Sequence, residues 1–378
     1  MNLSIKITWI LLSIAITRSV FADNCEPCPP KEPAKCDPCY ERALDKQYDQ
    51  GHGICEGILP KAYNASGSID LCGGLGAYVI GSFIYWESLG DQLDLGRVRI
   101  TSPTPQELEF LEFKTGYHMG FKVGLGSHLK KDNWDLFSQY TRLHKKENTI
   151  FDPANKTGTF STSWFQTISS SIILSEIISG IRASWKIELD KIDLELGRSY
   201  YIGNSVISRS FVSLSFYMLD QIYDLALSVP PNPALGIDVG IFNTSIKNDS
   251  WAIGPRFGLS TSWFIYKGFN LFGSATLSLM FAENEISGLG IEDSITYTVK
   301  KKDIYILRDV EEFSLGLSWG SYLTHDKWHF NISAAYEAQR YSHTNYMSYV
   351  SQLNDQSNEV KPGDLYLHGV TIVARFDF

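Results

Sequence analysis

The stretch from Leu365 to Phe378 constrains the fold more than any other part of the chain. Its side chains alternate between two faces, and from Val370 onward one face is apolar while the other is polar. A repeat of two residues is the pattern of a β-strand whose faces meet different surroundings. A sheet in a soluble protein shows the same alternation, so the pattern predicts a two-sided strand and leaves its surroundings open.

The position of this strand at the end of the chain narrows the choice. The strand is long enough to cross a membrane at a tilt, and it ends on an aromatic residue. This ending looks like the C-terminal assembly signal of bacterial outer-membrane β-barrels, in which a final Phe or Trp closes the last strand. We therefore interpret Phe376 and Phe378 as an assembly signal, with the barrel-assembly machinery as the expected partner.

The N-terminus reads as a secretory signal peptide over residues 1–22. Lys6 provides the charged end, the stretch from Ile7 to Ile16 is almost entirely apolar, and Ala22 is the small residue before the expected cleavage point. The apolar run is shorter than the roughly 20 residues of a membrane-spanning helix. Only helices and closed barrels satisfy every backbone amide in lipid, so we expect an exported barrel in the bacterial outer membrane.

The composition agrees with a barrel. Aromatic residues make up 13% of the chain, with 20 Tyr, 21 Phe and 9 Trp, and charged residues only 20%. Trp and Tyr are expected in rings where a barrel crosses the two membrane surfaces. The formal net charge of −9 argues against a nucleic-acid partner, because such a partner calls for basic patches.

Residues 23–68 form a segment rich in Cys and Pro, which we expect in the periplasm. Because an exported chain meets an oxidising compartment, disulfides within the molecule or between neighbours are the favoured interpretation. The two CxxC motifs leave zinc binding as an alternative, and redox catalysis as a further one without obvious support. The disulfide candidates are Cys25, Cys28, Cys36, Cys39, Cys55 and Cys72.

Residues 69–378 consist of strand-like segments without a helical crossover pattern, which disfavours a parallel sheet. We predict an all-β fold, a transmembrane antiparallel β-barrel of about 12 strands (range 10–14), with short periplasmic turns and long outer loops. The expected strands cover about 72–88, 108–129, 133–143, 175–189, 192–201, 206–228, 235–243, 250–266, 269–283, 311–323, 328–341 and 365–378. The expected turns lie at 130–133, 190–191, 267–268 and 325–327, and the long loops at about 90–106, 144–170, 283–311 and 342–363.

Several expected strands have one apolar and one charged face. Between Ile181 and Asp190, for example, apolar residues alternate with polar and charged ones. An isolated charge on the lipid side costs about 2–4 kcal/mol at the middle of the bilayer, so membrane barrels direct their charges inward. We expect the charged faces to line a watery lumen whose mixed signs give at most a slight cation preference. The pore-lining candidates are Arg182, Lys186, Glu188, Asp193, Glu195, Glu337, Gln339 and Arg375.

Motifs of glycine and aromatic residues follow one another along the chain at Gly116 to Gly126, Asn133 to Leu136, Ile192 to Arg198, Trp251 to Leu259 and Leu367 to Phe378. In this order and spacing they resemble the Legionella-type major outer membrane protein family, which also includes pore-forming proteins of amoeba-associated chlamydiae. The resemblance covers most of the chain beyond the cysteine-rich segment. It implies a pore-forming outer-membrane barrel and, for the clustered cysteines, disulfide cross-linking of the envelope.

No pattern of an active site emerges from the sequence. The eight His residues are scattered without an HExxH motif, and no nucleophile elbow occurs. We therefore expect no enzyme activity, no cofactor and no metal. The sequence favours a porin, a passive aqueous channel for small hydrophilic solutes or ions, surrounded by outer-membrane lipid as a monomer or homo-oligomer.

Two alternatives stay open. The barrel could be a structural or adhesin protein of the envelope, cross-linked through its N-terminal disulfides. The stretch 144–170, with Trp164 and Phe165, could fold inward as a constriction or remain an outer loop.

Overall fold

The computed structural model describes residues 65–69, 71, 74–100, 107–129, 133–151, 158–161, 180–229, 240–292, 295–324, 326–347 and 362–378. Outside these residues lie the expected signal peptide (1–22), all six cysteines, and Trp164 and Phe165. Within them, no helix is long and apolar enough to cross a membrane.

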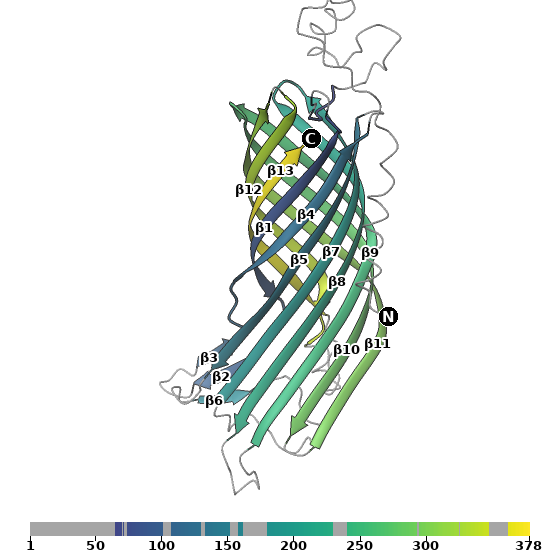
Figure 1. Cartoon of the computed structure of the whole chain (residues 1–378). Helices are drawn as coiled ribbons and strands as arrows, with labels where there is room; N and C mark the ends of the chain where they lie inside the picture. The colour runs from purple at the N-terminus through teal and green to yellow at the C-terminus, as the bar shows by residue number, and fades with distance from the viewer. Residues whose placement is uncertain are drawn as a thin grey trace, which may run out of the picture.

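Ten strands of the described chain form a closed antiparallel barrel (Figure 1), which confirms the predicted fold class. Their order around the barrel is β1-β13-β12-β11-β10-β9-β8-β7-β5-β4, and β4 pairs again with β1. The strands are β1 (Ala77–Gly90), β4 (Tyr117–His128), β5 (Trp134–Phe151), β7 (Gly180–Ile202), β8 (Val206–Val229), β9 (Gly240–Tyr266), β10 (Phe269–Glu292), β11 (Ile295–Leu323), β12 (Trp328–Asn345) and β13 (Gly363–Asp377). A separate sheet of order β3-β2-β6 consists of β2 (Gly96–Ile100), β3 (Glu107–Leu111) and β6 (Gly158–Ser161).

The last strand closes the barrel. β13 pairs with β12 on one side and with β1 on the other. The N–H of Phe378 donates to the carbonyl of Ala77 at 2.9 Å, and the N–H of Ala77 donates back at 3.2 Å. Because every strand of the wall has neighbours on both sides, the backbone groups are paired within the sheet, as lipid requires.

The expected number of about 12 strands is corrected to ten, which lies within the predicted range. Two pairs of expected strands are each one long strand: 175–189 and 192–201 belong to β7, and 235–243 and 250–266 belong to β9. The expected turn at 190–191 lies inside β7, because Asp190 and Lys191 alternate between its two faces. Much of the expected loops at 283–311 and 144–170 is strand as well, in β10, β11 and β5.

The barrel has two zones along its length. In the closed zone all ten strands are paired, and this zone ends where β11 leaves β12 at Val310↔Tyr341 and β4 leaves β5 at Phe121↔Arg142. Beyond it, β5, β7, β8, β9, β10 and β11 continue as an open curved sheet, here called the extension (Figure 1). The short β7–β8, β9–β10 and β11–β12 connections and the C-terminus lie at the opposite end, here called the turn end.

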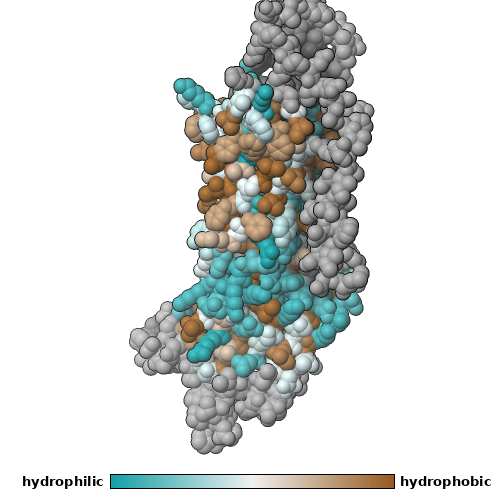
Figure 2. Space-filling model, in the orientation of Figure 1, coloured by the Kyte–Doolittle hydropathy of each residue, from teal (hydrophilic) through white to brown (hydrophobic). Residues whose placement is uncertain are grey.

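An apolar band surrounds the closed zone. Along β11, Phe313, Leu315 and Leu317 alternate with inward residues and are 56–62% exposed. The next outward residues towards the extension are Glu311 and Asp309. Figure 2 shows the same change on the surface, where a brown zone gives way to a teal one. The change marks the boundary between lipid and water on the outside of the barrel.

The position of this boundary can be tested with Leu315→Arg and Leu307→Arg. Both residues lie on β11, alternate with inward residues and are 62% and 66% exposed, but Leu307 lies beyond Glu311 in the extension. We expect Leu315→Arg to lower the free energy of unfolding by about 2–4 kcal/mol and Leu307→Arg by about 0–1 kcal/mol. Urea titration of the barrel in lipid vesicles measures both values, and equal losses would contradict the placement of the band.

Candidate functional site: the lumen of the barrel

The lumen contains a cavity of about 760 Å³ at the turn end. Lys267 and Gly268 of the β9–β10 turn line it, which fixes its position along the barrel. Hydrophilic groups converge on it from strands on all sides of the wall, so it can hold water and small polar solutes. Its polar lining includes Asp135, Arg209, Asn270, His329, Asn331 and Arg375.

Deeper in the lumen the cavity reaches a network of ion pairs, here called the charge belt, formed by Asp135, Lys191, Asp193, Glu195, Arg209, Arg256 and Glu312. These residues come from β5, β7, β8, β9 and β11, so the belt crosses the lumen from wall to wall. Their side chains are at most 20% exposed.

The first half of the belt centres on Glu195. Arg209 Nη2 lies 2.7 Å from Asp135 Oδ2, and Arg209 Nη1 lies 2.9 Å from Glu195 Oε2. The other carboxylate oxygen of Glu195 lies 2.6 Å from Arg256 Nη1. The ring of Phe211 lies near both guanidinium groups, at 4.9 Å from Arg209 Cζ and 5.2 Å from Arg256 Cζ. Ion pairs and cation–π contacts together fix the two arginines in the lumen.

The second half runs from Arg256 to β7. Arg256 Nη2 lies 3.0 Å from Glu312 Oε2, and Glu312 also pairs with Lys191. Lys191 Nζ lies 3.4 Å from Asp193 Oδ2. The belt therefore contains three cations and four carboxylates, an excess of one negative charge.

The alternation of β7 explains why the belt forms here. Lys191, Asp193 and Glu195 lie on one face, and the outward residues between and after them are apolar, as the lipid band requires. Gly197 continues the inward face next to Arg209, and a Cβ at this position would lie 2.6 Å from that guanidinium group. The absence of a side chain at Gly197 therefore leaves the space that Arg209 occupies.

Five of the eight pore-lining candidates face the lumen. Asp193 and Glu195 belong to the charge belt. Glu337 accepts from Lys122 Nζ at 2.6 Å, Gln339 accepts from the hydroxyl of Tyr341 at 3.0 Å, and Arg375 Nη2 lies 2.5 Å from Asp377 Oδ1. The part that these five residues take in permeation stays a prediction.

The other three candidates are corrected, because Arg182, Lys186 and Glu188 lie on the outward face of β7. They alternate with Ile181, Ala183, Trp185, Ile187 and Leu189, which are at most 4% exposed and belong to the buried core. In the extension water surrounds the outside of the sheet, so its polar side chains face outward. Lys186 and Glu188 form a half-exposed ion pair at 2.9 Å there.

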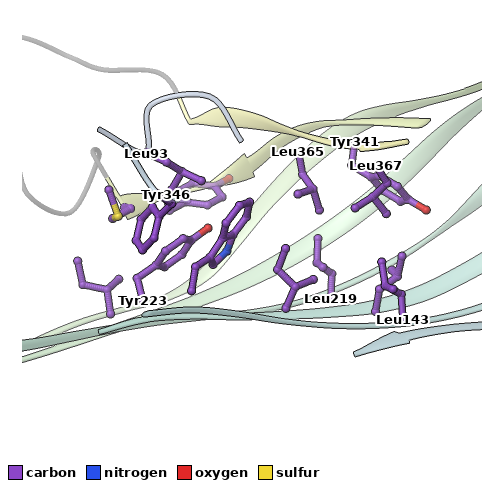
Figure 3. Close-up of a cluster of buried hydrophobic side chains, with 14 of the residues drawn as sticks. Leu93, Leu143, Leu219, Tyr223, Tyr341, Tyr346, Leu365 and Leu367 are labelled. Atoms are coloured by element: carbon purple, nitrogen blue, oxygen red, sulfur yellow. The ribbon is translucent and has the colours of Figure 1, made fainter. Parts of the chain in front are cut away.

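The concave side of the extension carries an apolar core that the sequence analysis did not predict. Trp185, Leu219 and Tyr223 contribute to it from β7 and β8. Residues that follow β1, β3 and β12, among them Leu93 and Tyr346, complete it (Figure 3). The lumen therefore changes from charged to apolar on passing from the closed zone into the extension.

The sequence analysis missed several lumen charges, namely Lys122, Asp135, Lys191, Arg209, Arg256 and Glu312. Arg256, for example, is a single charge between Pro255 and Phe257 in an otherwise apolar and glycine-rich strand. It forms no charged face of its own. The available signal was that an isolated charge in a lipid-facing strand must take the inward position.

The remaining sequence predictions concern the chain end, the cysteines and metals. The ring centroid of Trp328 lies 5.2 Å from that of Phe376 and 6.4 Å from that of Phe378, so the terminal aromatic residues pack at the turn end of β12. Their role as an assembly signal stays a prediction, as do the disulfides. Among the residues that the structure describes, no group of three or more His, Cys, Asp or Glu could hold a metal ion.

Glu195→Gln and Glu188→Gln compare the belt with the outer surface on the same strand. Glu195 is buried between two arginines, whereas Glu188 and its partner Lys186 are 32% and 39% exposed. We expect Glu195→Gln to lower the free energy of unfolding by about 3–5 kcal/mol, because it leaves buried guanidinium charge uncompensated. Glu188→Gln should cost about 0–1 kcal/mol. Denaturant titration in vesicles measures both, and a loss below 1 kcal/mol for Glu195→Gln would contradict a buried belt.

Comparisons with known proteins agree with this architecture. The family model described as Legionella pneumophila major outer membrane protein precursor matches residues 79–378. Comparison with curated proteins finds no match.

Three solved structures of bacterial barrels were compared with the chain. A Pseudomonas aeruginosa FadL homologue shares 8% identity over 83% of this chain and 96% of its own, with a TM-score of 0.28. The Pseudomonas putida toluene transporter TodX shares 8% over 80% and 90%, with a TM-score of 0.23, and outer-membrane expressed OmpT of Vibrio cholerae shares 7% over 82% and 100%, with a TM-score of 0.17. At these TM-scores the likeness carries no conclusion about function. The family match spans most of the chain, and the chain therefore belongs to the Legionella pneumophila major outer membrane protein family of the bacterial outer membrane.

Proposed function

We propose that the protein is a porin, a passive channel through the outer membrane for small hydrophilic solutes or ions. The observation that carries the proposal is the charged lumen inside the apolar band. Charged side chains enter this lumen from β4, β5, β7, β8, β9, β11, β12 and β13. Such charges are costly towards lipid and are tolerated in a wet interior. A passive channel needs no nucleophile and no cofactor, and we propose no enzyme activity.

The dimensions favour a narrow channel. Outer-membrane barrels have short turns on the periplasmic side, so the cavity lies towards the periplasm and the extension towards the outside. Ten strands enclose less space than the 16 to 18 strands of porins with wide aqueous channels. Because the belt side chains fill the lumen, permeation requires them to move, and we expect small conductance steps.

The charge belt is the proposed selectivity element. Charged side chains that line a pore favour ions of the opposite sign. The belt has four carboxylates against three cations, which supports the slight cation preference predicted from the sequence.

A pair of adjacent glutamates on β11 provides the test. Glu312 belongs to the belt, whereas Glu311 faces outward and pairs with Arg340 at 3.3 Å. In planar bilayers under a KCl gradient, we expect discrete conductance steps with a reversal potential on the cation-selective side. Glu312→Gln should shift that potential towards zero or towards anion selectivity, while Glu311→Gln should leave it unchanged. Correctly folded wild-type barrels that stay silent would overturn the porin proposal.

A structural envelope barrel is the second candidate, and the apolar core that fills the lumen of the extension favours it. The proposed cross-links between neighbours would come from the N-terminal cysteines. Non-reducing gels of intact envelopes test this candidate, because it requires large oligomers that dissociate with a reductant. Monomers under oxidising conditions would exclude the cross-linked scaffold.

A further inference from the structure

The residues Thr344–Met347, here called the lumen turn, leave the barrel wall at the end of β12. Pairing with β11 stops at Tyr341, and the pairing with β13 shifts between Tyr341 and Asn345. His343 has a positive φ of 51°, a backbone conformation that redirects the chain at this point. The four residues of the lumen turn are at most 3% exposed.

Three polar side chains from distant strands hold the backbone of this turn, and they are here called the latch. Gln221 Nε2 of β8 and Asn248 Nδ2 of β9 donate to the carbonyl of Thr344 at 2.9 Å and 2.8 Å. Arg308 Nη2 of β11 donates to the carbonyl of His343 at 2.8 Å. Since β8 and β9 lie across β10 and β11 from β12, these bonds place the lumen turn inside the barrel.

Arg308 is fully buried, and its partners are neutral. It also donates to the hydroxyl of Tyr217 at 2.8 Å and to Asn284 Oδ1 at 2.9 Å. Within the described part of the chain no carboxylate lies at ion-pair distance from it. A guanidinium group cannot lose its charge in a protein, so its burial depends on these hydrogen bonds. The carbonyl of His343 is thus part of what keeps a buried charge stable.

The latch is less complete than the charge belt. Among the described residues, Arg308 Nε and Asn248 Oδ1 have no hydrogen-bond partner. Its bonds to the lumen turn end on two backbone carbonyls, which water can replace when the turn moves away. Asn345 Nδ2 donates to the carbonyl of Asp91 at 2.6 Å, which joins the lumen turn to the segment that carries Leu93 and Leu95 of the apolar core.

We propose that the lumen turn is the gate of the barrel and that Arg308, Gln221 and Asn248 are positioning residues that hold it closed. The inference rests on the proposed porin function, because a gate matters only where solutes pass. In the closed position, the lumen turn and the apolar core separate the charge belt from the outer end. Release of the three bonds lets the turn withdraw, which exposes the polar latch residues to water and connects the belt with the extension.

The test measures the position of the turn separately from conductance. Thr344→Cys places a thiol in the lumen turn without removing the carbonyl that the latch binds. In folded barrels in vesicles we measure its reaction with a membrane-impermeant maleimide, with peptide masses to separate this site from the native cysteines. Adding Arg308→Met should accelerate the reaction by at least about tenfold, the size expected for one lost buried hydrogen bond.

Three further variants control this result. Gln221→Leu should act in the same direction as Arg308→Met, and Arg308→Lys, which keeps a donor, should give an intermediate rate. Arg182→Met removes an outward arginine of the extension and should leave the rate unchanged. In bilayers, Arg308→Met should raise the fraction of time that the channel is open.

The outcomes separate the two proposals. Unchanged labelling in folded Arg308→Met and Gln221→Leu barrels would overturn the latch, even if the wild-type protein conducts. Accelerated labelling together with silent bilayers would overturn the porin function, and with it the role of the turn as a gate for solutes.

Discussion

Contact with lipid over only part of each strand is the constraint on which the structure depends. Inside the apolar band the outward face must be greasy, so polar and charged residues take the lumen. Beyond the band the outside is wet, and the concave face packs an apolar core. On β7 the inward face changes from Leu189 to Lys191 while the outward face changes from Asp190 to Ile192. One strand thus joins two opposite patterns without changing its period.

This change explains which predictions the sequence supported. The fold class and the inward positions of Glu195 and Arg375 follow from alternation together with the charge rule, because both residues lie at the level of the band. The same rule placed Arg182 on the wrong face, because alternation separates two faces and does not say which one meets lipid. That information depends on how far the strand projects from the membrane, which its neighbours in the sheet determine.

The strand count shows the same limit. Asp190 and Lys191 interrupt two apolar runs, and adjacent charges between such runs are typical of a turn. The structure continues through them because the level at which β7 leaves the membrane requires a charge on each side. The apolar core and the lumen turn were also out of reach of the sequence, because their contacts join segments that follow β1, β3 and β12 to strands far away in the chain.

A solute that enters from the periplasmic side would meet layers of decreasing polarity. The cavity comes first, then the charge belt with its paired side chains, then the latch with its neutral hydrogen bonds, and last the apolar core. Strong ion pairs make the belt a fixed part of the wall. The weaker bonds of the latch make the region beyond it the part of the lumen where opening costs least.

The central claim is that outward residues of one strand meet lipid at one level and water at another. A nitroxide scan of β7 tests it directly, with the label introduced as a noncanonical amino acid so that the six native cysteines remain unchanged. At Ile192, Leu194 and Leu196 we expect contact with membrane-dissolved oxygen, and at Arg182, Lys186 and Glu188 contact with a water-soluble nickel complex. The same accessibility at all six positions would contradict the account.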